Sequence, residues 1–128
     1  MFDFKGMREQ IRKVTRARYN LDKARAKAAR NAALSGYSSN GDRNIRTTAE
    51  AAYDTAQHDL DIMRGNLLPL INAMPDNDRK RALYLRYIEG KSVREIAIKM
   101  MYAENYMYRF IEMAENEIND KLVSKVKT

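Results

Sequence analysis

LYLRYIEGKSVREIA, residues 83–97, contains the end of one predicted helix and the start of the next. Gly90 is positioned to end the first helix, because glycine commonly follows the last helical residue. Ser92 with Glu95 three residues later forms a capping box, which predicts that the second helix begins directly after Ser92. The core face of this short second helix is predicted to consist of Val93, Ile96, Ala97 and Met100.

Further helices are predicted on both sides of this stretch. After Pro75, either Asp76 or Asn77 is expected to cap a helix that runs to about Ile88. A break near 101–103 is expected to precede a final helix, whose apolar residues recur at steps of three and four: Met107, Ile111, Ala114, Ile118 and Leu122. The same periodicity predicts that the outward side of this helix carries Glu104, Asn105, Tyr108, Arg109, Glu112 and Glu115.

This arrangement resembles the fourth region of bacterial sigma factors, in which a helix ending in Leu-Arg-Tyr is followed by a Gly-containing connector, Ser-x-x-Glu-Ile-Ala, a turn and a recognition helix. The matching residues are Leu85, Arg86, Tyr87, Gly90, Ser92, Glu95, Ile96, Ala97, Met100, Tyr102, Met107, Arg109 and Ala114. Met101 stands where that family usually has Gly, and Ala103 where it usually has a Ser or Thr cap. With a helical hairpin before it, the whole layout is similar to phage late-gene regulators of the ArpU and RinA type.

The resemblance implies a helix-turn-helix whose last helix reads the major groove of DNA. In this interpretation the base-reading residues are Glu104, Asn105, Tyr108 and Arg109, with Arg109 suited to a guanine and Asn105 to an adenine. Phosphate contacts are expected from Lys91, Ser92 and Arg94, near the start of the supporting helix.

The region before Pro75 is expected to form a second helical body. Thr47 and Glu50 form a capping box after a predicted loop over residues 35–46, which is rich in turn formers. The helix that follows has heptad spacing of Ala49, Tyr53, Ala56, Leu60, Met63, Leu67, Leu70 and Met74. Pro69 interrupts this pattern and is expected to kink the helix or end it early.

The first helix is predicted from about Met7 to Leu34, and it holds most of the chain's excess positive charge. Residues 1–34 contain ten basic and three acidic side chains, whereas the whole chain has a net charge of +7. On the side opposite its apolar face lies a basic stripe, which consists of Arg8, Arg12, Arg16, Lys23, Lys27 and Arg30. Alanines on both helices favour close antiparallel packing as a hairpin.

The sequence therefore predicts an all-α fold of about five helices. Residues 1–74 are assigned to the helical hairpin and residues 75–128 to the sigma region 4-like helix-turn-helix. Because the chain has no Cys and a single His58, we expect no metal and no cofactor. We find no pattern of catalytic residues and predict that the chain is not an enzyme. With no signal peptide and no apolar run long enough to span a membrane, a soluble protein in the cytoplasm of a bacterial host is expected.

Two functional hypotheses follow from these patterns. The first is a sequence-specific transcriptional regulator of phage or prophage origin, whose partner is double-stranded DNA and whose hairpin dimerises or contacts RNA polymerase. The second is a phage-encoded protein-binding inhibitor or adaptor, for example an anti-CRISPR or host-defence antagonist, built on a helix-turn-helix scaffold. Acidic residues on the last helix favour the second hypothesis, since exposed carboxylates are repelled by phosphates.

Overall fold

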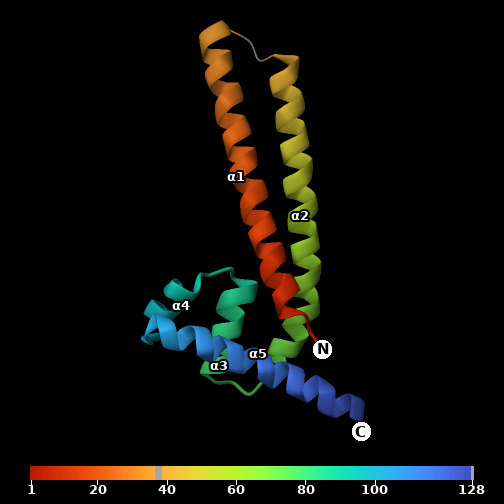
Figure 1. Cartoon of the computed structure of the whole chain (residues 1–128), viewed down its shortest axis with the longest axis vertical. Helices are drawn as coiled ribbons and strands as arrows, with labels where there is room; N and C mark the ends of the chain where they lie inside the picture. Colours follow the sequence, from red (N-terminus) through yellow and green to blue (C-terminus); the bar gives the residue numbers. More distant parts are fainter. Residues whose placement is uncertain (37–38, 128) are drawn as a thin grey trace. The chain divides into compact units, whose positions relative to one another are not determined.

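All regular secondary structure is helical in the computed structural model, which describes residues 1–36 and 39–127 (Figure 1). The α-helices are α1 (Phe4–Ser35), α2 (Asn40–Asn72), α3 (Asp78–Leu83), α4 (Val93–Met100) and α5 (Glu104–Lys127), and a π-helical segment, η1 (Tyr84–Ile88), directly follows α3. The predicted all-α fold class is confirmed. None of the helices in the described ranges is long and apolar enough to cross a membrane.

The chain folds into two compact units. One unit consists of Met1–Phe4 and Met63–Thr128, and the other of Lys5–Ile62. We call them the helix-turn-helix unit and the hairpin unit. Both α1 and α2 contribute residues to each unit. The predicted division of the sequence between residues 74 and 75 stays a prediction.

In the hairpin unit, α1 and α2 run side by side in opposite directions (Figure 1). Four pairs define this register, since partners farther along α1 meet residues closer to the start of α2. Gln10 Nε2 donates to the Ala56 carbonyl at 2.9 Å, and the Arg18 guanidinium lies 5.6 Å from the Tyr53 ring centroid. Farther along α1, Arg25 Nη2 lies 3.6 Å from Glu50 Oε1, and Asn31 Nδ2 donates to Asp42 Oδ2 at 3.0 Å. The predicted antiparallel hairpin is therefore present.

The start of α2 corrects the sequence prediction. The helix begins at Asn40, so residues 40–46 of the predicted loop are helical, and residues 37 and 38 lie outside the described residues. Ser39 provides the cap, because its Oγ accepts a hydrogen bond from the Asp42 backbone N–H at 3.1 Å. The Asn31 hydrogen bond lowers the pKa of the Asp42 carboxyl, which lies near the positive end of the helix. Thr47 and Glu50 lie inside α2 and do not begin it.

The apolar stripe of α2 is present with one shift in register. Ala56, Leu60 and Leu67 are buried and Met63 is half-buried, as the heptad pattern predicts, and Met74 is buried just after the end of the helix. Near the end of the helix, Ile71 is fully buried, whereas the predicted Leu70 is half-buried. The shift follows Pro69, which α2 accommodates and after which it continues for three residues before ending at Asn72.

The helix-turn-helix unit contains a dense apolar core. Its largest fully buried side chains are Leu67, Ile71, Leu83, Tyr87, Ile96 and Met107. The N-terminal segment belongs to this core: the Phe4 ring lies 5.3 Å from the Tyr87 ring, and the Phe2 N–H donates to Asn119 Oδ1 at 2.8 Å. These contacts fix the first residues of the chain against α5 and η1.

Candidate nucleic-acid interface

The connector before α4 adopts the geometry that its sequence predicts. Asn77 caps α3 by accepting from the backbone N–H groups of Arg79 and Lys80, which confirms one of the two predicted caps. Gly90 has a φ of +73° and ends the preceding helical segment. The Ser92 Oγ accepts from the Glu95 N–H at 3.1 Å, and the Ser92 N–H donates back to Glu95 Oε1 at 3.4 Å. The capping box is confirmed, and α4 begins at Val93.

The turn between α4 and α5 depends on Met101. This residue has a φ of 63° and a ψ of 40°, a left-handed conformation that costs a side-chain-bearing residue about 1–2 kcal/mol. Its side chain is 92% exposed and contributes no burial to offset that cost. Glycine adopts this backbone conformation without the steric cost, so Met101 stands at a position that favours glycine.

A side-chain network holds the turn where α5 lacks a capping side chain. Ala103, the residue before α5, has no side-chain oxygen to cap the helix, as the sequence indicates. The Tyr102 hydroxyl instead donates to Asp78 Oδ2 at 2.9 Å, a hydrogen bond that raises the pKa of Tyr102 above its ordinary value. The Tyr102 ring also stacks on Phe110, with centroids 5.4 Å apart. These contacts link the turn to both α3 and α5.

The first turns of α5 present the predicted base-reading residues to solvent. Glu104, Asn105, Tyr108 and Arg109 are all exposed, and none of them makes a side-chain hydrogen bond or ion pair within the described residues. Met107 and Ile111 lie on the opposite side and are buried, and Phe110, which the sequence analysis did not assign to the core, is buried with them. The four reading candidates therefore share one open surface.

The predicted phosphate-contacting residues lie near the start of α4. Ser92 and Arg94 are exposed, and Lys91 is half-buried. The Ser92 oxygen already accepts the capping hydrogen bond from the Glu95 N–H, but its hydroxyl proton remains able to donate. Arg94 and Lys99, both exposed on α4, add positive charge to the supporting helix.

The outward face of α5 carries one exposed carboxylate fewer than the sequence predicts, because Glu115 is buried. The periodicity placed this residue outside, but its side chain is only 7% exposed, and Glu115 Oε1 accepts a hydrogen bond from the Tyr87 hydroxyl at 3.0 Å. The prediction was wrong because α5 packs a wider face than one apolar stripe, and the Tyr87 hydroxyl supplies a polar partner within that face. Glu104 and Glu112 remain exposed.

The basic stripe belongs to the hairpin unit, whereas the base-reading candidates belong to the helix-turn-helix unit. Within the stripe Arg8 is half-buried, and the exposed members are Arg12, Arg16, Lys23, Lys27 and Arg30. The structure thus brings together the reading residues with Lys91, Ser92 and Arg94 in one unit, and the stripe belongs to the other unit.

No family model, curated protein or solved structure matches this chain. The resemblance to sigma region 4 therefore stays a prediction, and the function of the surface is inferred from its own residues and geometry. Among the described residues, no group of three or more His, Cys, Asp or Glu side chains is arranged to hold a metal ion.

Proposed function

We propose that this chain is a sequence-specific DNA-binding transcriptional regulator of phage or prophage origin, which reads the major groove with the first turns of α5. The observation that carries the proposal is the open surface formed by Glu104, Asn105, Tyr108 and Arg109, directly after a capped short helix and a tight turn. A helix-turn-helix uses the early residues of its second helix to contact base edges, while the first helix crosses the DNA backbone.

The chemistry of these side chains suits base recognition. An arginine pairs with the O6 and N7 atoms of guanine through two hydrogen bonds, and an asparagine pairs with the N6 and N7 atoms of adenine. Arg109 and Asn105 have side-chain donors that no group in the described residues occupies. Both therefore remain available to a base.

The charge on the helix-turn-helix unit also supports the proposal, because α5 exposes fewer unpaired carboxylates than its sequence suggests. Glu115 is buried against Tyr87, and Glu117 pairs with Arg79 at 3.2 Å, so neither carboxylate stands unpaired on the outward face. The exposed cations Arg94 and Lys99 lie on the supporting helix.

The test compares two single substitutions on α5, each of which removes one positive charge. Arg109→Ala is expected to weaken binding to the duplex that the wild-type chain selects by about 1–3 kcal/mol, because one bidentate base contact is worth that much. Lys121→Ala removes an equal charge from an exposed position three turns farther along and is expected to change affinity by less than about threefold. Equal effects of the two variants on selected and unrelated duplexes would contradict base reading by α5.

A second function, a protein-binding inhibitor or adaptor, is favoured by the apolar character of the same helix. Tyr106, Tyr108 and Met113 are 46%, 58% and 46% exposed, and aromatic and Met side chains are enriched at protein interfaces. In this alternative Glu104 and Glu112 flank a docking surface for a basic partner. Loss of DNA binding on Arg109→Ala with no change on Met113→Ala favours the regulator, because base pairing depends on the guanidinium and Met113 is not a base-reading candidate. An inhibitor would depend on the exposed apolar side chains.

A further inference from the structure

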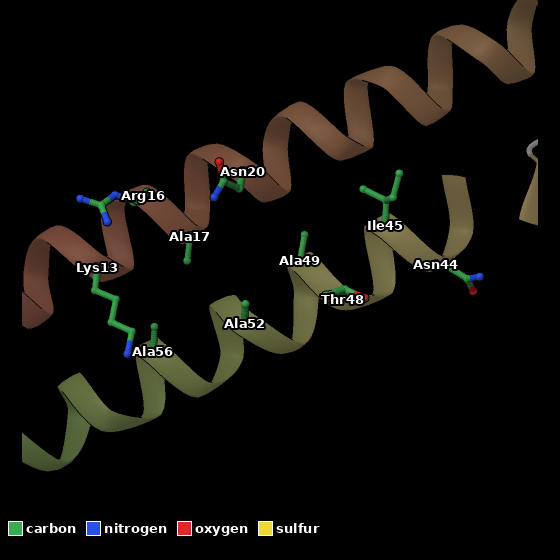
Figure 2. Close-up of a pocket in the computed structure, with 10 residues that line it drawn as sticks. All are labelled: Lys13, Arg16, Ala17, Asn20, Asn44, Ile45, Thr48, Ala49, Ala52 and Ala56. Atoms are coloured by element: carbon green, nitrogen blue, oxygen red, sulfur yellow. The ribbon is translucent and has the colours of Figure 1, made fainter. Parts of the chain in front are cut away.

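A groove of about 600 Å³ lies between α1 and α2 in the hairpin unit (Figure 2). Its α2 wall carries mainly small side chains, including Thr48, Ala49 and Ala52, while Ala17 lines the α1 wall. These short side chains leave the space between the two helices unfilled, and Ala52 is exposed to solvent. Ile45, which is 53% exposed, adds a larger apolar side chain to the α2 wall. The groove is therefore open, its surface is mainly apolar, and its volume can accept side chains from another molecule.

The charges at this groove have one sign. Lys13 and Arg16 line it on α1, and no Asp or Glu belongs to the lining. Farther along α1, two other cations meet partners on α2: Arg18 lies over Tyr53, and Arg25 pairs with Glu50. Lys13 and Arg16 make no ion pair within the described residues. In Figure 2 the Lys13 side chain extends from α1 toward α2, beside the apolar lining.

The length of the groove suits a helix. Its α2 wall extends from Asn44 to Ala56, which corresponds to about 18 Å along the helix axis, or a little over three turns of a third helix. A helix that occupies such a groove anchors apolar side chains at positions i, i+3, i+4 and i+7. Carboxylates on the flank of that helix would meet Lys13 and Arg16, and such complementarity increases both the specificity and the rate of association.

We propose that this groove binds an acidic amphipathic helix of another protein. A nucleic-acid backbone is a poor fit, because its phosphates gain nothing from an alanine-rich wall. The α1 helix of a second copy is also a poor fit, because residues 1–34 carry ten basic and three acidic side chains and would bring positive charge toward Lys13 and Arg16. The proposal does not depend on DNA reading by α5, since the groove and α5 belong to different units.

The first experiment titrates the full wild-type chain with a designed, fluorescein-labelled peptide of about 18 residues, with Leu at i, i+3, i+4 and i+7 and Glu on the flanking positions. Saturable binding with a Kd below about 100 µM is expected. Amide chemical-shift changes are expected to concentrate at Thr48, Ala49 and Ala52. The control peptide carries Lys in place of every Glu and is expected to bind at least about tenfold more weakly.

Two pairs of variants then test the charge and the shape of the groove. Lys13→Glu is expected to weaken the acidic peptide by about tenfold, whereas Arg12→Glu, on the adjacent residue outside the lining, changes binding by less than about threefold. Ala52→Trp is expected to fill the groove and to weaken binding of the acidic peptide by about tenfold or more. Ala51→Trp places the same side chain on an exposed neighbour outside the groove and is expected to leave binding unchanged.

Four outcomes would overturn the proposal. The first is absence of saturation by the acidic peptide at about 1 mM, and the second is equal binding of the lysine peptide. The third is a wild-type dimer that Ala52→Trp converts to a monomer, which would assign the groove to a second copy of the chain. The fourth is a loss of duplex DNA binding on Ala52→Trp with unchanged peptide binding, which would make the groove a nucleic-acid surface. The wild-type titration does not require any variant to fold.

Discussion

The hairpin unit and the helix-turn-helix unit are stabilised in different ways. Of the 21 buried apolar residues among those described, five lie in Lys5–Ile62 and sixteen in the helix-turn-helix unit. The hairpin depends on a few buried residues, such as Leu21 and Leu60, together with exposed polar pairs that contribute little individually. We therefore expect the hairpin to open at lower free energy than the helix-turn-helix. The unit that presents the base-reading residues is therefore expected to be the more rigid one, and the unit that contains the open groove to be the more adaptable.

The largest expected effect is the loss of a side chain from the sparse core of the hairpin. Leu60 is 2% exposed, and Leu60→Ala is expected to destabilise the chain by about 2–5 kcal/mol, measured by denaturant unfolding. Hydrogen exchange is expected to accelerate mainly at amides of residues 5–62, because few other apolar contacts hold that unit. The matched control is Ile62→Ala, at a position that is 51% exposed, and it should shift the free energy of unfolding by less than about 0.5 kcal/mol. An unchanged midpoint for Leu60→Ala, or equal acceleration in both units, would remove the distinction between them.

Alanine substitutions at two glycines are expected to change the stability of the chain in opposite directions. Gly90 has a φ of +73°, and a Cβ there would lie 3.4 Å from Arg64 Nη2, so Gly90→Ala is expected to destabilise by about 1–2 kcal/mol. Gly65 lies inside α2 with nothing within 4 Å of an added Cβ, and Gly65→Ala is expected to stabilise by about 0.5–1 kcal/mol. Thermal or denaturant unfolding of each variant measures the change in stability. If the two substitutions shifted stability in the same direction, the backbone explanation of the connector before α4 would be wrong.

A smaller effect is expected at the turn of the helix-turn-helix. Because Met101 is left-handed and 92% exposed, Met101→Gly removes a steric cost without removing packing and is expected to stabilise the chain by about 0.5–1 kcal/mol. The greater flexibility of glycine in the unfolded chain offsets part of the gain. Met101→Ala serves as the control, since alanine keeps the Cβ, and should change the melting temperature little. Destabilisation by glycine would show that the Met101 side chain supports the turn.

Local signals were sufficient to predict most of the elements. The capping box of Ser92 and Glu95, the position of Gly90 and the periodic apolar residues of α5 each depend on neighbours a few residues away. The first two are confirmed, and the α5 stripe is buried from Met107 to Ile118, whereas its last member, Leu122, is half-buried. The start of α2 was mispredicted because Ser39 and Asp42 stand within a run of turn-forming residues, where a helix cap and a loop have the same composition.

Contacts between distant residues were not predictable from periodicity. The burial of Glu115 depends on Tyr87, which is 28 residues away in the sequence, and the packing of Phe4 depends on the same tyrosine. The Tyr102 hydrogen bond to Asp78 is another long-range contact, and it holds a turn that lacks a capping side chain. For the candidate site, helical phase was enough to predict that Asn105, Tyr108 and Arg109 are exposed, because α5 is regular over those turns.

The most direct test of base reading by α5 is selection from a random pool of DNA duplexes at about 100 mM salt, where electrostatic interactions are screened beyond roughly 10 Å. The wild-type chain is expected to enrich one sequence that contains a guanine, and Arg109→Ala is expected to lose the preference at that position while it stays folded. Failure of the folded wild-type chain to enrich any sequence would contradict the proposal that α5 reads DNA.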